Sequence, residues 1–365
     1  MIRPNEDERV EIAEQLLGTT LSSGEIASLF KAYFNHYESI ICPGDEKDIV
    51  VDIEVLELQS HGDVLDCAKR LCKSTALARD EITRSWLHGR ATTVAERNYV
   101  SRAIVNITFM IDCDERDYYP GGSSDEGQRA KWEGNQTFVD FLEKSLLPLQ
   151  RSVNTNVTLS DKKSLKAWKL AKRHGIRIRG TDNLLEHLVY NPRERTLAIF
   201  HHVAYLRAHL RRSKNENLDL GFAESLALKT LPPRLLFETL LSLHSILFPI
   251  ASSGSKRSIS LLRKCIRAQG LDSELLWFEY VRPIPSDFTF KYWGRRLEKL
   301  QELTKRPPPR NSLVSWFERH TSERNALTVA IIGLFLTALL GFLGVVVGMF
   351  QLVIAWMAWK DARQV

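Results

Sequence analysis

The sequence predicts a mainly α protein: a multi-helix soluble body with a small β element and one C-terminal transmembrane helix. Apolar residues recur every three or four positions along most of the chain, which is the period of an amphipathic helix. Short alternating stretches at 176–179 and 196–200 have the period of strands. No charged residue occurs in the 35 positions from Asn325 to Trp359. That run is longer than the roughly 20 apolar residues a helix needs to span a bilayer.

The composition is that of a folded protein. Of 365 residues, 44% are hydrophobic and 26% charged, which excludes a wholly disordered chain. The five cysteines are odd in number and include no CxxC pair, so neither a disulfide framework nor a zinc motif is indicated. The charged N-terminus lacks the apolar run of a signal peptide. We therefore expect a cytosolic body whose sequons at Asn106, Asn135 and Asn156 stay unglycosylated.

The patterns divide the chain into six segments. These are a helical N-terminal part (1–150), a basic α/β segment (151–214), a helical C-terminal part (215–305), a Pro-rich spacer with a juxtamembrane amphipathic helix (306–324), a transmembrane helix (325–348) and an interfacial tail (349–365).

In the first segment, capping residues and apolar periodicity mark the helices. Asn5 and Ser23 are the expected caps of two helices, and Gly18 ends the first of them. Further apolar faces lie at 64–72, 100–111 and 138–146, whereas 119–127 is a polar loop and 48–58 fits either a helix or a strand.

The second segment is strongly basic. Between Arg151 and Lys214 there are 15 Lys and Arg against four Asp and Glu, a local charge of +11 in a chain of net +6. Such an asymmetry is informative about partners rather than about fold. We predict a basic surface formed by Lys162, Lys163, Lys166, Lys169, Lys172, Arg173, Arg177 and Arg179.

Around the two strands of this segment we expect short helices. They are a basic helix at 162–173, a short helix at 183–189 capped by Thr181 or Asp182, and a helix at 202–212, with a turn at 190–192. The third segment has helical patterns at 222–226, 235–248, 258–268 and, strongly amphipathic, 286–305.

The spacer and the flanks of the hydrophobic run predict a membrane topology. Three prolines at 307–309 form a stiff link, and the helix at 312–324, with Trp316 and Phe317, either lies at the membrane interface or packs on the body. Five cations at 305–324 precede the run and two follow it, which puts the N-terminal body in the cytosol. The position of the run near the C-terminus predicts a tail anchor.

Two features of the hydrophobic run have more than one interpretation. Residues 348–359 either continue the helix with a tilt or lie among the headgroups, with Trp356 and Trp359 as interfacial anchors. A row of small residues at steps of three and four either packs against another helix or reflects the ordinary abundance of glycine in membranes. The row consists of Gly333, Thr337, Gly341, Gly344 and Gly348.

No local motif for catalysis or cofactor binding is present. The chain lacks a phosphate-binding loop, a dinucleotide fingerprint, an HExxH pair and a GxSxG elbow. The acidic run at 112–117 lacks the ligand pattern of a calcium loop, so we interpret it as a solvated helix end. We expect no catalytic residue and no cofactor.

Histidines and carboxylates of the basic segment are candidate metal ligands. His202 and His209 are seven residues apart and share a helix face near His201, but no third ligand of the usual type lies beside them in the sequence. We therefore expect packed or surface histidines and no metal site. Asp182, Glu186 and His187 fit a capped short helix equally well.

Three stretches resemble a known group of proteins. Residues 175–188, 196–206 and 315–325, the last running straight into the hydrophobic segment, are similar to blocks in an uncharacterised family of filamentous-fungal, tail-anchored membrane proteins. The likeness covers about half the chain. It implies a cytosol-facing, single-pass membrane protein, in some cases encoded in an accessory gene cluster, and it implies no catalytic residues.

The sequence thus predicts a non-enzymatic, membrane-anchored interaction protein. Its expected partners are the lipid bilayer, anionic headgroups, a second copy through the transmembrane helix, and an unidentified protein. A nucleic-acid-binding module at 151–214, loosely similar to a winged helix, is one alternative, which a membrane tether disfavours. An enzyme without a local motif is the other.

Overall fold

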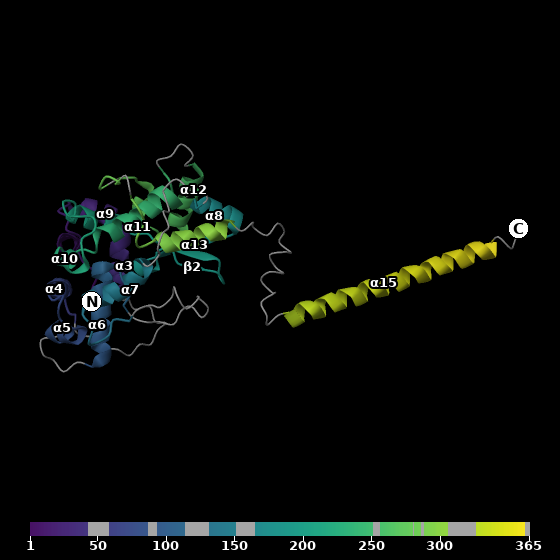
Figure 1. Ribbon diagram of the computed structural model, residues 1–365, viewed down its shortest axis with the longest axis horizontal. Coiled ribbons are helices and arrows are strands. Elements are labelled where there is room, and N and C mark those ends of the chain that lie inside the picture. Colours follow the sequence, from purple (N-terminus) through teal and green to yellow (C-terminus); the bar gives the residue numbers. More distant parts are fainter. Residues whose placement is uncertain are drawn as a thin grey trace. The chain divides into compact units, whose positions relative to one another are not determined.

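The structure, a computed structural model, has two compact units, Met1–Arg306 and Pro307–Val365. The first is mainly helical with one small sheet, and the second contains a long helix (Figure 1). The predicted fold class is therefore confirmed. The structure describes residues 1–42, 58–86, 93–113, 131–150, 165–250, 256–279, 281–285, 288–305 and 326–361.

Several sequence predictions lie outside the described residues. They concern the polar loop at 119–127, most of 48–58, the sequon at Asn156, the cations Lys162 and Lys163, the prolines at 307–309, and the helix at 312–324 with Trp316 and Phe317.

The N-terminal half of the first unit is built of short helices with capped starts. They are α1 (Glu6–Ile12), η1 (Ala13–Leu17), α2 (Ser23–Leu29), α3 (Lys31–Ile41), α4 (His61–Lys73), α5 (Arg79–Trp86), α6 (Val94–Phe109) and α7 (Phe138–Gln150). Asn5 caps α1 as predicted, in a reciprocal capping box with Glu8. The cap of α2 is Ser22 rather than Ser23, because Glu25 completes the box three residues after Ser22.

A three-stranded sheet lies in the middle of the chain. Strand β1 (Arg177–Thr181) pairs in parallel with the buried β3 (Thr196–Phe200), and β2 (Tyr190–Asn191) pairs antiparallel with the other edge of β3. Both predicted strands are confirmed, whereas the expected turn at 190–192 begins as strand β2. Strands β2 and β3 thus form an antiparallel hairpin, to which β1 adds a parallel strand.

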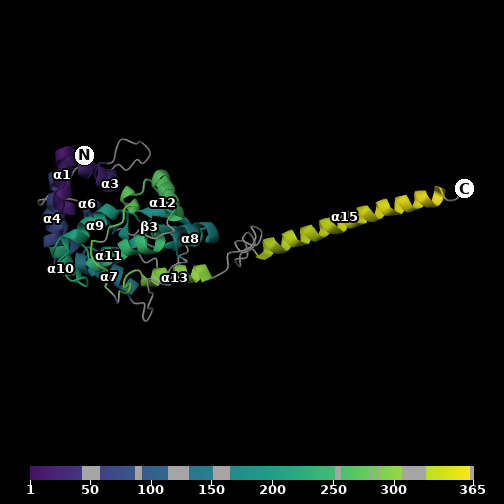
Figure 2. The same ribbon diagram turned by 90° about the horizontal axis from the view of Figure 1, so that it is seen from above.

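The other described elements of this half of the first unit are helices. They are α8 (Ala167–His174), η3 (Leu184–Glu186), α9 (Val203–Arg212), α10 (Phe222–Ala227), α11 (Pro233–Leu241), η4 (Ser242–Leu247), α12 (Lys256–Gln269), η5 (Ser273–Leu276) and α13 (Gly294–Lys305). Figures 1 and 2 both show α8 beside α12. Buried apolar side chains from Ile12 to Leu300 form one core.

Three predicted helices of this half are shorter than expected. The basic helix predicted at 162–173 is α8, which begins only at Ala167 after its N-cap Lys166. The predicted helix at 183–189 is only the 3₁₀ turn η3, and its cap is Asn183, whose side-chain oxygen accepts the Leu185 N–H. The predicted helix at 286–305 begins only at Gly294. Before it, the buried carboxylate of Glu238 accepts the backbone N–H groups of residues 291, 292 and 293, which are held outside the helix.

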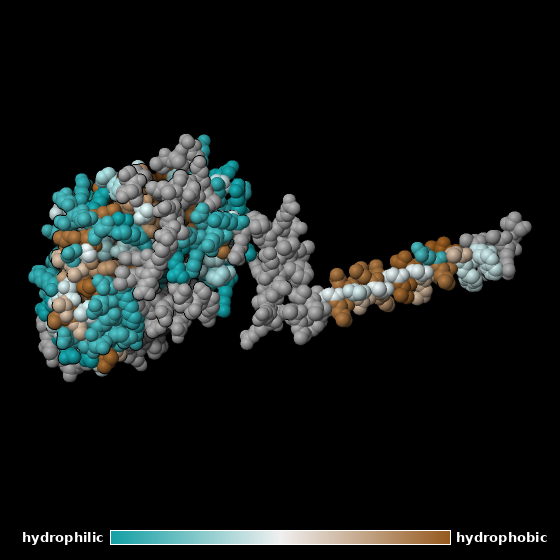
Figure 3. Space-filling view, in the orientation of Figure 1, coloured by the Kyte–Doolittle hydropathy of each residue, from teal (hydrophilic) through white to brown (hydrophobic). Residues whose placement is uncertain are grey.

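The second unit contains α15 (Ala326–Asp361), a continuous helix of 36 residues. Residues Gly333–Met357 are long and apolar enough to cross a membrane, and hydrophobic side chains run along this helix in Figure 3. Residues 348–359 continue this helix without a break. Trp356 and Trp359 lie on it with 60% and 53% of their surface exposed.

Candidate functional site: a basic surface and a histidine–aspartate cluster

Cations from three elements form a basic surface on the first unit. Six belong to the segment that contains α8 and β1, and five belong to α12; neither the 166–179 nor the 256–269 stretch contains an Asp or Glu. We define the basic surface as Lys166, Lys169, Lys172, Arg173, Arg177, Arg179, Lys256, Arg257, Arg263, Lys264 and Arg267.

Direct contacts hold these elements together. The guanidinium of Arg257 on α12 lies 4.9 Å from the ring centre of Trp168 on α8, a cation–π contact. The Gln269 amide at the end of α12 donates to the Ile178 carbonyl (2.9 Å) and accepts the Gly180 N–H (3.0 Å). The two cationic stretches, about 80 residues apart in the sequence, are therefore one structural surface.

Most of these cations face solvent, and five of them have no counter-charge among the described residues. All but Lys166 and Lys169 are exposed. Within the described residues, no carboxylate lies within 4.0 Å of a charged nitrogen of Lys172, Arg173, Arg179, Arg263 or Arg267. Hydrophilic residues accordingly cover this part of the body in Figure 3. Because these five cations have no counter-charge among the described residues, we expect a positive potential over the basic surface.

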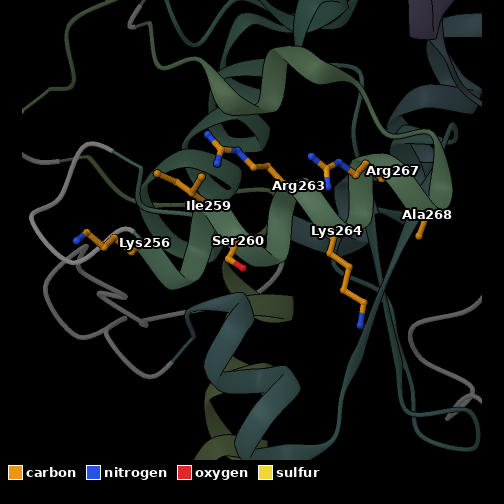
Figure 4. Close-up of a pocket in the computed structure, with 7 residues that line it drawn as sticks. All are labelled: Lys256, Ile259, Ser260, Arg263, Lys264, Arg267 and Ala268. Atoms are coloured by element: carbon orange, nitrogen blue, oxygen red, sulfur yellow. The ribbon is translucent and has the colours of Figure 1, made fainter.

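A surface concavity of about 740 Å³ lies against α12. The described residues that line it include Lys256, Arg263, Lys264 and Arg267, all of which project from this one helix in Figure 4. The apolar pattern predicted α12 as a helix, but its part in the basic surface was not predicted. A signal was present, since this helix has five cations and no anion.

A second cluster gathers three histidines around one carboxylate. Thr181 at the end of β1 pairs with Phe200 at the end of β3, so the next residues, Asp182 and His201, meet at the same edge of the sheet. The carboxylate Oδ1 of Asp182 lies 3.2 Å from Nε2 of His201 and 2.6 Å from Nε2 of His202. Its Oδ2 lies 3.4 Å from Nδ1 of His36, which α3 contributes.

The other ring nitrogens of these histidines differ in their partners. Nδ1 of His201 accepts the backbone N–H of Asp272 (3.2 Å), so the hydrogen of the neutral ring is on Nε2 and points to Asp182. Nε2 of His36 contacts the side-chain oxygen of Asn106 (2.9 Å). Nδ1 of His202 is buried and has no hydrogen-bond partner among the described residues.

The cluster has a marked effect on ionisation. Burial by itself would raise the pKa of Asp182, but the hydrogen bonds from His201, His202 and His36 outweigh it and hold that pKa well below its usual range. Burial, together with the neighbouring His201, lowers the pKa of His202 to about 3. Asp182 is therefore a carboxylate, its side chain 49% exposed, beside imidazoles that are at most 9% exposed.

In the folded body a carboxylate lies beside two of these histidines, His201 and His202. His202 and His209 do not act together, because His209 packs against Tyr205 in the core, with ring centres 4.1 Å apart. This carboxylate is that of Asp182, about 20 residues before His201 and His202 in the sequence. Only the parallel pairing of β1 with β3 brings them together.

The other candidates have structural roles. Asp112 forms an ion pair with Arg102 (3.0 Å). Glu186 accepts the hydroxyl of Thr181 (2.7 Å). His187 is fully buried, with Nε2 2.7 Å from the Ser242 hydroxyl.

The small residues of α15 lie along one helix face, which no other described residue of the second unit covers. A Cβ built on Gly333, Gly341, Gly344 or Gly348 would meet no atom within 4 Å. Thr337 directs its hydroxyl to the Gly333 carbonyl (2.9 Å) within the same helix. The face can therefore accommodate the backbone of another helix.

Comparisons with protein-family models, with curated proteins and with solved structures gave no match. The resemblance to filamentous-fungal proteins therefore stays a prediction from the sequence blocks alone.

Proposed function

We propose that this protein is a non-enzymatic, single-pass membrane protein whose cytosolic body docks on an anionic membrane through the basic surface. One observation carries the proposal: α8, β1 and α12 together form one surface of eleven cations. Neither of the stretches that supply them, 166–179 and 256–269, contains an Asp or Glu.

The energetics favour a membrane partner. A Lys or Arg near an anionic leaflet contributes about 1 kcal/mol, and the attraction decays over a Debye length of about 8 Å at physiological salt. A body tethered to the bilayer by α15 stays at high local concentration beside its partner, so a few cations suffice for docking. The cations that precede α15 favour the cytosolic side, where anionic lipids are concentrated.

The test uses the body alone, residues 1–306, which form a compact unit with its own core. Co-flotation is measured with vesicles of phosphatidylcholine containing increasing phosphatidylserine. We expect binding that rises with phosphatidylserine and falls as salt is added. In the test variant Lys172, Arg173, Lys264 and Arg267 are all replaced by Glu, and binding should fall at least tenfold.

A matched variant separates the surface from net charge. Replacing Lys31, Lys69, Lys73 and Arg84 by Glu changes the net charge by the same amount, four times two units, at exposed positions outside the basic surface. This variant should keep most of the binding. Equal losses in both variants, or no binding of the native body at low salt, would refute docking through the basic surface.

The same preparation tests the nucleic-acid alternative. The membrane proposal predicts that vesicles containing phosphatidylserine compete successfully against duplex DNA and single-stranded RNA for the body. If the body is retained on either nucleic acid and does not bind vesicles, membrane docking is refuted and nucleic-acid binding is supported instead.

A further inference from the structure

One face of α12 presents hydrogen-bond donors to solvent. With about 3.6 residues per turn, five donor side chains of this helix fall within an arc of about 100°. They are Lys256, Ser260, Arg263, Lys264 and Arg267. All five are exposed, and all five line the concavity of about 740 Å³. Figure 4 shows two rows, with Arg263 and Arg267 on one side of the helix and Ser260 and Lys264 on the other.

The helix that carries these side chains is fixed to the body. Its other face buries Ser258, Leu262 and Cys265. At its C-terminal end, the Gln269 side chain hydrogen bonds to the backbone of β1 through both its amide nitrogen and its oxygen. The backbone of α12 therefore needs no ordering when a ligand binds to the exposed face.

The charges on this face repel one another. Arg267 lies four residues after Arg263 and three after Lys264, so these like charges are neighbours on the helix surface and destabilise it. None of the three has a carboxylate within 4.0 Å among the described residues. A bound polyanion removes this repulsion, whereas the helix alone retains it.

The number and type of the donors indicate which anion fits. A phosphomonoester has three acceptor oxygens and a charge of about −1.5 to −2, so about two such groups balance the four cations of this face. Guanidinium groups, which Arg263 and Arg267 supply, bind phosphate oxygens through pairs of parallel hydrogen bonds. The volume of about 740 Å³ is that of a site for a small molecule rather than for a single ion.

We propose that this face of α12 binds a lipid headgroup with two phosphomonoester groups, that is, a bisphosphorylated inositol lipid. The inference rests on the proposed membrane docking and names the lipid that the docking recognises. A free inositol polyphosphate has the same phosphate chemistry. The anchor favours the lipid as the source, because α15 keeps the body beside a bilayer.

The experiment compares two lipids at equal surface charge. Flotation measures binding of residues 1–306 to phosphatidylcholine vesicles that contain either phosphatidylserine or a phosphatidylinositol bisphosphate with its two phosphates on neighbouring ring carbons. The proportions are adjusted until both kinds of vesicle have the same zeta potential, so that nonspecific attraction is equal. We expect the body to bind the bisphosphate vesicles at least tenfold more tightly.

Two variants with the same loss of charge locate the preference. Replacing both Arg263 and Arg267 by Gln should reduce the preference for bisphosphate vesicles at least fivefold. Replacing both Lys172 and Arg173 by Gln removes two charges from the α8 part of the basic surface instead. This control should weaken binding to both kinds of vesicle alike and keep the preference. An equal preference in the two variants would overturn the site on α12.

Free inositol trisphosphate, the soluble headgroup of the same lipid, distinguishes the two sources. It should displace the body from bisphosphate vesicles. It should also bind the body at least tenfold more weakly than the vesicles do, because only a leaflet also contacts the cations of α8 and β1. Failure to displace the body would overturn recognition of the headgroup, and equal affinity for the free headgroup would overturn a lipid as the ligand.

The native body separates this inference from the proposed function. Equal binding to the two kinds of vesicle at the same zeta potential would overturn the bisphosphate site and leave docking through the basic surface in place. Binding to neither kind of vesicle at low salt would refute both.

Discussion

Buried histidines are the most unusual individual residues of this body. Burial lowers the pKa of His187, His202, His209 and His244, so these rings are neutral in the folded protein at pH 7. His244 packs against Phe278, and among the described residues neither of its ring nitrogens has a partner. Because the folded protein holds this imidazole neutral and without a partner, protonation favours the unfolded chain. The stability of the fold therefore depends on pH.

His244 allows the sign and size of this linkage to be tested. Its folded-state pKa is about 3, against an ordinary value of 6.5. Below pH 6.5 the unfolded chain therefore binds a proton that the folded protein does not, and stability falls as the pH falls. From pH 6.5 to 5 the loss from this residue is about 2 kcal/mol.

We expect His244→Phe to lose about 2 kcal/mol less stability than the native body between pH 7 and pH 5, because phenylalanine binds no proton in either state. Urea unfolding of residues 1–306 at both pH values measures the difference. Identical losses in the two proteins would mean that His244 is not buried as a neutral ring.

At the scale of single elements, local chemistry fixes where helices begin and end. Gly18 ends η1 with a φ of 69°, in the left-handed region that other residues avoid. A Cβ at this position would also lie 2.4 Å from the Arg212 guanidinium. Gly24 is in the first turn of α2, where a Cβ would meet nothing within 4 Å and φ is not positive.

These two glycines predict opposite effects of the same substitution. Gly18→Ala should lower stability by about 1–2 kcal/mol, because it strains the backbone and displaces Arg212. Gly24→Ala should raise stability by about 0.5–1 kcal/mol, because alanine loses less backbone entropy in a helix. Thermal unfolding of residues 1–306 carrying either substitution measures the change in stability. A loss of stability in both variants would contradict the gain expected for Gly24→Ala.

The small-residue face of α15 is tested in the membrane. If this face packs against a second copy, Gly344→Leu weakens self-association in a membrane two-hybrid assay, since the bulky side chain separates the helix backbones. Val346→Leu, about 200° around the helix, is the control and should leave the signal unchanged. If Gly344→Leu gives the same association signal as Val346→Leu, these glycines take no part in self-association.

How far the sequence was informative depends on the range of the interactions. Features set by neighbouring residues, such as the box of Asn5 with Glu8 or the alternation around Ile178, were predictable. The start of α13 was not, because Glu238, more than 50 residues earlier, binds the backbone before it. The histidine–aspartate cluster around Asp182 was missed for the same reason, since strand pairing and not spacing creates it.

At the scale of the whole molecule, the chain consists of a compact body and a helix that can span a membrane. The body contains its own core and its basic surface, whereas α15 is apolar over Gly333–Met357. The proposed topology therefore places the basic surface and the histidine–aspartate cluster on one side of a bilayer. It requires no anchor besides α15.

Glycosylation mapping of the full-length protein in cells, combined with carbonate extraction, tests this topology. A sequon appended after Val365 should be glycosylated, while Asn106, Asn135 and Asn156 remain unmodified. Asn106 also contacts His36 in the folded body. The native protein should resist carbonate extraction, and removal of residues 325–365 should release the body into the supernatant. Glycans on the native sequons, or a truncated body that stays in the carbonate-resistant pellet, would contradict a cytosolic body held by α15.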